Sequence, residues 1–281
     1  MLSYRHAFHA GNHADVLKHF VLMQVLQHAT QKDKPLWYID THAGAGMYAL
    51  DTGYATQNAE FDGGIMRLLN QPDLPVALAD YVTLVKRLNP EGQLRRYPGS
   101  PTIAQEILRK DDRMRLFELH PHDSKLLRQT FKGAGRNIMI DAEDGFASIK
   151  AILPPQSRRA VVLIDPPYEE KQDYRRVVDA LKDSLQRFAT GSYILWYPIL
   201  QRPEPQQMLE RLKKLELASW LHVSLSVQSP SMDGFGMHGS GLFIINPPWT
   251  LPVILAETMP YLVKLLGQDA GAGFVLESQI P

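Results

Sequence analysis

The sequence of 281 residues predicts an α/β fold built on a mostly parallel sheet, and three observations support this. Residues 160–164 form a short apolar run without alternation, which is typical of a strand buried on both faces of a parallel sheet. Residues 36–39 form a second such strand, which leads into a loop with Gly44 and Gly46. Further along the chain, strand patterns alternate with helical patterns, as in strand–helix–strand units.

The composition narrows the class of protein. The chain has no cysteine, which excludes disulfides and thiolate metal sites, and 44% of its residues are hydrophobic, enough for a sizeable core. The N-terminus lacks an apolar signal core, and no run of about 18 apolar residues could span a membrane. The formal net charge is zero, so any nucleic-acid-binding surface must be local. We therefore expect a soluble cytoplasmic protein without a membrane segment.

The sheet is expected to have seven strands, with the last one antiparallel because a hairpin joins the final two. If the sixth strand is parallel, loop 229–240 emerges on the ligand-binding face and could contact substrate. We assign no role to residues 268–281. The expected strands cover residues 36–39, 113–119, 137–140, 160–164, 193–196, 221–227 and 242–245, and the expected helices cover residues 13–31, 101–110, 122–131, 171–188 and 204–217.

Residues 48–98 interrupt the alternation of strands and helices. A helix and then the second strand should follow the glycine loop directly, but about fifty other residues come first. They contain several prolines and short helical patterns at 64–70 and 75–88. We predict an inserted helical subdomain for substrate recognition at 48–98, with the main domain formed by residues 1–47 and 99–281. One end of the insertion is basic and forms either a nucleic-acid contact or a solvated helix face; its residues are Lys86, Arg87, Arg95 and Arg96.

The loop after the first strand indicates a cofactor. The spacing of Asp40, Gly44 and Gly46 is that of the first loop in S-adenosylmethionine-dependent methyltransferases of Rossmann-like fold, whose glycines let the backbone approach the methionine part closely. A tight turn between a strand and a helix would give similar residues.

Other polar residues follow the next strands. Glu118 ends the second strand, where an acid suits two ribose hydroxyls. Asp144 and Gly145 follow the third strand, the usual place for an acid near the adenine of the cofactor, although Asp141 and Glu143 lie close enough to be alternatives.

Ser100 begins the helix at 101–110, ahead of Pro101. It is either the N-cap of that helix or a cofactor contact, since the helix N-terminus would point back toward the glycine loop.

The Asp-Pro-Pro-Tyr sequence at the end of the fourth strand indicates methylation of an exocyclic amine. Pro166 and Pro167 cannot continue the strand, so Asp165 lies at its carboxyl end, where open α/β sheets bind ligands. The Asp165 carboxylate and the Pro166 carbonyl can accept hydrogen bonds from an adenine N6 amine and make its nitrogen more nucleophilic. Tyr168 can stack on the extruded base, a contact worth roughly 1–3 kcal/mol. The alternative is a turn without chemistry.

A second copy of the pattern occurs at Asn246, Pro247, Pro248 and Trp249. Because the last strand is antiparallel, this copy falls on the opposite edge of the sheet. Asp165 is therefore the better candidate.

The N-terminal residues suggest an arm over the site. Asn12 is a plausible N-cap for the helix at 13–31. The neighbouring histidines could suggest a metal site, but no carboxylate motif accompanies them and Gly11 breaks their spacing, so we expect no metal. An arm that is only solvated remains an alternative. An ordered arm over the site would present Tyr4, Lys18 and His19 as its polar tips. Arg5, Lys18 and partly charged histidines such as His6 would favour contact with phosphate, so Lys18 is a candidate for cofactor binding and Arg5 and His6 are candidates for RNA.

Seven motifs together resemble one family along nearly the whole chain, the bacterial 23S ribosomal RNA adenine N6-methyltransferases called J. The motifs are the N-terminal Tyr-Arg-His-Ala-Phe-His-Ala-Gly-Asn-His-Ala-Asp-Val-Leu-Lys-His, Asp-Thr-His-Ala-Gly-Ala-Gly, Tyr-Pro-Gly-Ser-Pro, Glu-Leu-His-Pro, Asp-Gly-Phe, Leu-Ile-Asp-Pro-Pro-Tyr and Leu-Trp-Tyr-Pro.

The resemblance implies a class I methyltransferase fold with a small helical insertion, 23S rRNA as the substrate and no obligate protein partner. It implies that Asp165 accepts the proton and that Tyr4 contacts the RNA. The residues implied to contact S-adenosylmethionine are His19, His42, Ser100, Glu118, Asp144, Gly145 and Asp165. A DNA adenine methyltransferase and a protein for the use of external DNA remain alternatives.

Overall fold

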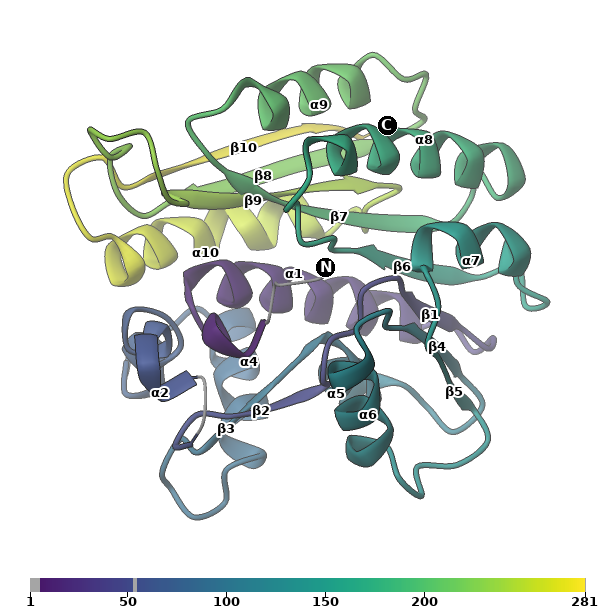
Figure 1. Cartoon of the computed structure of the whole chain (residues 1–281), viewed down its shortest axis with the longest axis horizontal. Helices are drawn as coiled ribbons and strands as arrows, with labels where there is room; N and C mark the ends of the chain where they lie inside the picture. Colours follow the sequence, from purple (N-terminus) through teal and green to yellow (C-terminus); the bar gives the residue numbers. More distant parts are fainter. Residues whose placement is uncertain (1–5, 53–54, 281) are drawn as a thin grey trace.

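The structure is a computed structural model that describes residues 6–52 and 55–280. A twisted sheet of eight strands runs through the centre, with helices on both faces (Figure 1). The strands of this sheet are β1 (Trp37–Asp40), β4 (Arg113–Phe117), β5 (Ile138–Asp141), β6 (Ala160–Ile164), β7 (Ser192–Ile199), β8 (Trp220–Ser226), β9 (Gly239–Ile245) and β10 (Gly273–Gln279).

The strand order is β10-β8-β9-β7-β6-β1-β4-β5. The strands from β5 through β4, β1 and β6 to β7 are all parallel, so their carboxyl ends meet at one edge. The strand β9 is antiparallel to both β7 and β8, which makes β8 run in the same direction as β7. The fold class and the antiparallel seventh strand are confirmed, and the loop after β8 emerges at the carboxyl edge.

The two faces of the sheet have separate hydrophobic cores. The helices α7 (Gly145–Ile152), α8 (Lys171–Arg187) and α9 (Pro203–Lys213) cover one face, and the helices α1 (His13–Thr30), α5 (Ser100–Ile107), α6 (Pro121–Thr130) and α10 (Leu251–Leu266) lie on the other (Figure 1).

The helix α1 is buried on nearly all sides, because the sheet lies against one side and the insertion against the other (Figure 1). Its apolar residues do not form one stripe, as expected for a helix surrounded by protein. Asn12 is its N-cap, as predicted, and accepts hydrogen bonds from the backbone N–H groups of Ala14 and Asp15 at 3.0 Å. A short 3-10 helix, η1 (His6–Phe8), precedes α1.

The insertion begins and ends in a two-stranded antiparallel ribbon, β2 paired with β3. Its elements are β2 (Met47–Ala49), α2 (Ala55–Asn58), the 3-10 helix η2 (Glu60–Gly63), α3 (Met66–Leu69), α4 (Val76–Arg87) and β3 (Arg96–Pro98). Buried side chains such as Leu68 and Tyr81 belong to the same core as α1, so the insertion packs as part of the main body. Arg87 and Arg95 at its basic end form surface ion pairs with acidic neighbours.

The structure corrects three details of the sequence analysis. The sheet has eight strands rather than seven, because residues 273–279 pair along β8 as the edge strand β10. The helix α10 was not predicted. Gly99, not Ser100, is the N-cap of α5, and Ser100 is the first residue of the helix.

The second proline motif lies at the edge opposite to Asp165, as predicted. The Asn246 side-chain amide donates hydrogen bonds to the carbonyls of Ala189 and Gly191, just before β7 begins. Within the described residues, no helix combines the length and apolar content needed to cross a membrane.

Substitution of Leu22 tests the central position of α1, because this side chain of the helix is fully buried in the core. Leu22→Ala should lower the free energy of unfolding by about 2–5 kcal/mol, since it removes buried methyl groups and leaves a cavity. Chemical denaturation measures this. Val76→Ala is the matched control at an exposed position on α4 and should change stability by less than about 0.5 kcal/mol. Equal effects of the two substitutions would contradict the packing.

Candidate active site

A pocket opens at the carboxyl edge of the sheet, between the ends of β1, β4 and β6 and the first turns of α1. Most of the predicted site residues line it, although they come from separate parts of the chain. The predicted residues in its wall are His6, Lys18, His19, His42, Gly44, Ser100, Glu118, Asp144, Gly145, Asp165, Pro166 and Pro167. Tyr4 and Arg5 lie outside the described residues.

A buried ion pair joins α1 to the end of β6. Lys18 Nζ donates a hydrogen bond to Asp165 Oδ2 at 2.6 Å and lies 2.9 Å from Asp15 Oδ1. The Lys18 side chain is only 5% exposed and its ammonium faces the Trp196 ring at 5.6 Å. Burial alone would lower the pKa of Lys18, but the two carboxylates overcome this and raise it well above its usual value. The lysine is therefore a fixed cation between two acids.

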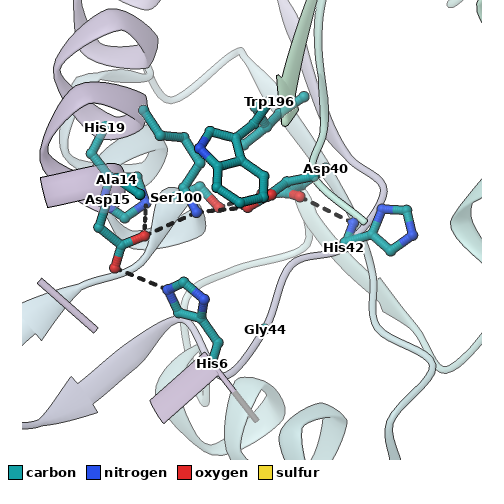
Figure 2. Close-up of polar contacts among 12 residues, drawn as sticks. His6, Ala14, Asp15, His19, Asp40, His42, Gly44, Ser100 and Trp196 are labelled. Carbon is teal, nitrogen blue, oxygen red and sulfur yellow. Dashed lines mark hydrogen bonds and ion pairs between the residues drawn. The ribbon is translucent and has the colours of Figure 1, made fainter. Parts of the chain in front are cut away.

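Asp15 is the centre of the polar network at the N-terminus of α1. Its Oδ2 accepts a hydrogen bond from His6 Nε2 at 2.9 Å (Figure 2). The same oxygen accepts a second hydrogen bond from the backbone N–H of Gly11 at 2.9 Å. Burial would raise the pKa of Asp15, but His6 and Lys18 hold it well below its usual value. Asp15 thus ties His6, which lines the pocket, to the lysine that holds Asp165.

His19 connects the pocket to the insertion. Its Nδ1 lies 2.9 Å from the hydroxyl of Tyr97, which lies 2.7 Å from the hydroxyl of Tyr81 on α4. Burial lowers the pKa of His19 to about 3, so the ring is neutral at physiological pH. The chain of hydrogen bonds fixes the orientation of this ring from the insertion side.

Asp40 does not line the pocket, which corrects the expectation that it contacts the cofactor. It is fully buried, and its Oδ2 accepts hydrogen bonds from the hydroxyls of Tyr38 at 2.6 Å and Ser100 at 2.7 Å. Burial raises the pKa of Asp40 to about 6 despite these donors. Asp40 therefore anchors the start of α5 to the end of β1, and Ser100, which faces it, remains in the pocket wall.

The glycine loop forms a narrow backbone cradle. The Gly44 N–H donates a hydrogen bond to Glu118 Oε2 at 2.8 Å, and a Cβ atom at Gly44, where φ is +61°, would clash with the hydroxyl of Tyr48. Gly46 does not line the pocket; its carbonyl accepts hydrogen bonds from Gly99 N–H and from the hydroxyl of Thr102. This corrects the expectation that Gly46 contacts the cofactor. Its carbonyl instead connects the glycine loop to the first turn of α5.

Glu118 follows β4 directly and lies opposite the cradle. Its Oε1 accepts a hydrogen bond from the His120 N–H at 2.7 Å. Burial raises the pKa of Glu118 to about 7, although the hydrogen bonds from the backbone N–H groups of His120 and Gly44 lower it. Near neutral pH this carboxyl group can therefore lose its proton and accept hydrogen bonds from a ligand.

Asp144 caps α7 beyond Glu118. It accepts a hydrogen bond from the Phe146 N–H at 2.9 Å and a second from the Arg176 guanidinium at 2.6 Å. The same guanidinium lies 4.7 Å from the centre of the Phe146 ring. A Cβ atom at Gly145 would clash with the Thr41 carbonyl, so only glycine allows α7 to start this close to β1.

Tyr168 does not face the pocket, which contradicts the expectation that it stacks on a substrate base. The residue has φ +52° and its ring is 5% exposed, packed against the rings of Tyr174 and Trp196. Its hydroxyl donates a hydrogen bond to the Trp196 carbonyl at 2.8 Å. The left-handed turn after Pro167 rotates the ring into the core, where it fastens the Asp165 turn to β7.

Two of the N-terminal histidines are paired with separate carboxylates. His6 contacts Asp15, and His9 Nδ1 contacts Glu60 at 2.9 Å. Within residues 6–52 and 55–280, no three acidic or histidine side chains are arranged to hold a metal ion.

Sequence reasoning missed several residues of the site. Asp15 gave no signal, because its role depends on contacts with His6 and Lys18 rather than on a motif. Phe146 could have been found, since it directly follows the predicted Asp144 and Gly145. Arg176 lies on α8, a helix that was predicted without a role in the site.

Known proteins resemble this chain over its whole length. The family model described as "Ribosomal RNA large subunit methyltransferase D, RlmJ" matches residues 33–276. The chain is 46% identical over 278 residues to ribosomal RNA large subunit methyltransferase J of Haemophilus influenzae, covering 99% of this chain and 98% of the relative. It is 47% identical over 280 residues to the protein of the same name from Escherichia coli, covering 100% and 99%.

A solved structure has the same fold. The crystal structure of protein LPL1258 from Legionella pneumophila superimposes with a TM-score of 0.88 at 34% sequence identity, covering 96% of this chain and 98% of that one.

Asp15→Asn should destabilise the chain by roughly 3 kcal/mol at neutral pH, because an amide cannot balance the buried Lys18 charge. The native carboxylate stabilises the fold above its unfolded pKa of about 4, and this stabilisation is lost as pH falls through its lowered folded pKa. The difference between the two proteins should therefore shrink in acid. Denaturation at several pH values measures it, with Asp179→Asn as a control at an exposed acid. Equal stability at pH 7 would contradict the role of Asp15.

Proposed function

This chain belongs to the ribosomal RNA large subunit methyltransferase J family, and we propose that it transfers a methyl group from S-adenosylmethionine to the N6 amine of an adenine in 23S rRNA. The observation that carries the proposal is the position of Asp165. It follows the central strand β6, lines the pocket beside the glycine cradle and is held by Lys18.

The residues of the pocket suit the cofactor. Gly44 lines the pocket without a side chain, so its backbone can approach the methionine part closely, and Glu118 beside it suits the two ribose hydroxyls. Asp144 and Gly145 line the same pocket, and we assign them to the adenine of the cofactor. We therefore assign S-adenosylmethionine to this pocket, held also by residues at its rim: Lys18, His19, His42 and Ser100. When bound, the cofactor supplies an electrophilic methyl group.

Asp165 and Pro166 position the amine. Lys18 occupies Oδ2 of Asp165, and we assign Oδ1 to accept a hydrogen bond from the N6 amine, with the Pro166 carbonyl as the second acceptor. Two acceptors on one amine hold its lone pair toward the methyl donor, so much of the rate arises from positioning. Asp165 then accepts the released proton, directly or by relay. We assign no base-stacking role to Tyr168, because its ring is part of the core.

RNA would approach from the side of the N-terminal arm. His6 lines the pocket and is held by Asp15, and it is preceded by Tyr4 and Arg5, which we propose as RNA contacts. We further propose that the insertion at 48–98 contributes to substrate recognition, that the reaction takes place in the cytoplasm and that it needs no metal and no obligate protein partner.

The direct test is transfer of a labelled methyl group to 23S rRNA from a strain that lacks this gene, followed by mapping of the modified base. The proposal predicts one N6-methylated adenine. Duplex DNA from an unmethylated host serves as the second acceptor, because a DNA adenine methyltransferase would use the same chemistry. Methylation of the DNA alone, or no binding of S-adenosylmethionine, would reject the proposal.

Asp165→Ala should reduce methyl transfer by at least about 100-fold while S-adenosylmethionine binds with only a modest loss, because the carboxylate is one of several cofactor contacts but the one side-chain acceptor assigned to the amine. Isothermal titration and a single-turnover assay separate the two effects. Asp179→Ala, an acid on the surface of α8, is the matched control and should keep full activity. A variant without Asp165 that methylates at the wild-type rate would refute the mechanism.

Binding of S-adenosylmethionine should strengthen as pH rises through about 7, because only the ionised form of Glu118 accepts hydrogen bonds from both hydroxyls. Below that pH the affinity should fall by up to about tenfold per pH unit, the limit for one proton. Glu118→Gln should remove this part of the pH dependence, so the difference between the two profiles isolates it from titration of the cofactor itself. Parallel profiles would show that Glu118 does not bind the ribose.

A further inference from the structure

A second groove lies at the opposite edge of the sheet, beside the amino ends of β6 and β7. It is open, with a volume of about 1000 Å³. One wall is the turn that contains Asn246 and Trp249, and the other is the segment after α1 together with the loop before β6. The groove is separated from the active site by the length of β6, five residues or roughly 17 Å.

The Asn246–Trp249 turn is rigid and presents an aromatic ring to solvent. Asn246 has φ +53°, and its amide is fixed by the carbonyls of Ala189 and Gly191 at 2.8 and 2.7 Å. Two prolines follow, and Trp249 is 74% exposed. A large apolar ring held in this way loses little conformational entropy when a ligand stacks on it.

The opposite wall is basic. Lys32, Lys34 and Arg158 are exposed, and within the described residues none of the three forms an ion pair with a carboxylate. Asp33 is the one acidic residue among the described residues that line the groove, so the wall keeps a positive charge. The charges are presented by a fixed backbone, because the Arg159 guanidinium donates hydrogen bonds to the carbonyls of Ala29 and Lys34.

We infer that this groove binds a single-stranded segment of the RNA substrate, with phosphates at Lys32, Lys34 and Arg158 and one base stacked on Trp249. The inference rests on the proposed function, which makes RNA the partner. Exposed cations around a flat aromatic ring are the pattern by which proteins hold single strands without reading sequence. The core of a protein–protein interface would instead be depleted of lysine. A long RNA could therefore contact the groove and the active site at the same time, whereas a short oligonucleotide could contact only one of them.

The first experiment measures binding of a fluorescein-labelled oligouridine of about 20 nucleotides, longer than one binding site of this kind. Trp249→Ala should weaken binding about tenfold, as expected when one base can no longer stack, and Trp249→Phe should restore most of it. Substituting Lys32, Lys34 and Arg158 together by alanine should reduce the slope of log Kd against log salt by about 2, or about 0.7 for each phosphate that the protein no longer neutralises.

Two matched controls lie on α10. Val253→Ala removes an exposed apolar side chain and Lys264→Ala an exposed cation, and both should bind the oligonucleotide like the parent chain. In methyl transfer to full-length 23S rRNA, Trp249→Ala should raise KM by a similar factor with kcat unchanged, because the groove lies away from Asp165.

Several results would overturn the inference: unchanged binding by Trp249→Ala, an equal loss in Val253→Ala, or a dimer in sedimentation that Trp249→Ala dissociates. Failure of the proposed function is distinguishable from these. A chain that methylates no RNA but binds oligouridine through Trp249 would refute the methylation and support the groove, whereas methylation without dependence on Trp249 would refute the groove alone.

Discussion

The buried contact between Lys18 and Asp165 is the interaction on which the site depends. It joins residues 147 positions apart in the chain, at 2.6 Å, and brings the first turns of α1 against the end of β6. A lysine without partners would be costly at this depth, and Asp15 supplies the second carboxylate. The three side chains therefore stabilise one another only when helix and sheet are correctly packed. The packing of α1 against the sheet therefore also places Asp165.

This constraint explains why α1 is the most buried helix and why the insertion packs on it. The pocket has one wall made by strand ends and another made by α1, and the insertion holds α1 from behind through Tyr81, Tyr97 and His19. A change in how the insertion packs would reach the pocket through this chain of hydrogen bonds. The insertion thus supports the catalytic wall physically, whatever it contacts in a substrate.

Much of the fold could be predicted from sequence because local rules dominate there. Two prolines stop β6 at Asp165, and the hairpin to β9 sends Asn246 to the opposite edge. The partners of Lys18 could not be predicted, because nothing local distinguishes a buried lysine from a solvated one. The burial of Tyr168 depends on a left-handed turn and on a carbonyl of β7, and both are properties of the assembled fold. The edge strand β10 is largely exposed, so it lacks the apolar pattern that identified the other strands.

A double-mutant cycle on Lys18 and Asp165 tests the central claim most directly. Lys18→Met and Asp165→Ala would be assayed alone and together for kcat of methyl transfer, with cofactor binding measured in each variant. If the lysine acts by holding the carboxylate, its substitution should cost little more once Asp165 is gone, so the double variant should be about as slow as Asp165→Ala. Losses that multiply would contradict the account, because they would show that the two residues act independently.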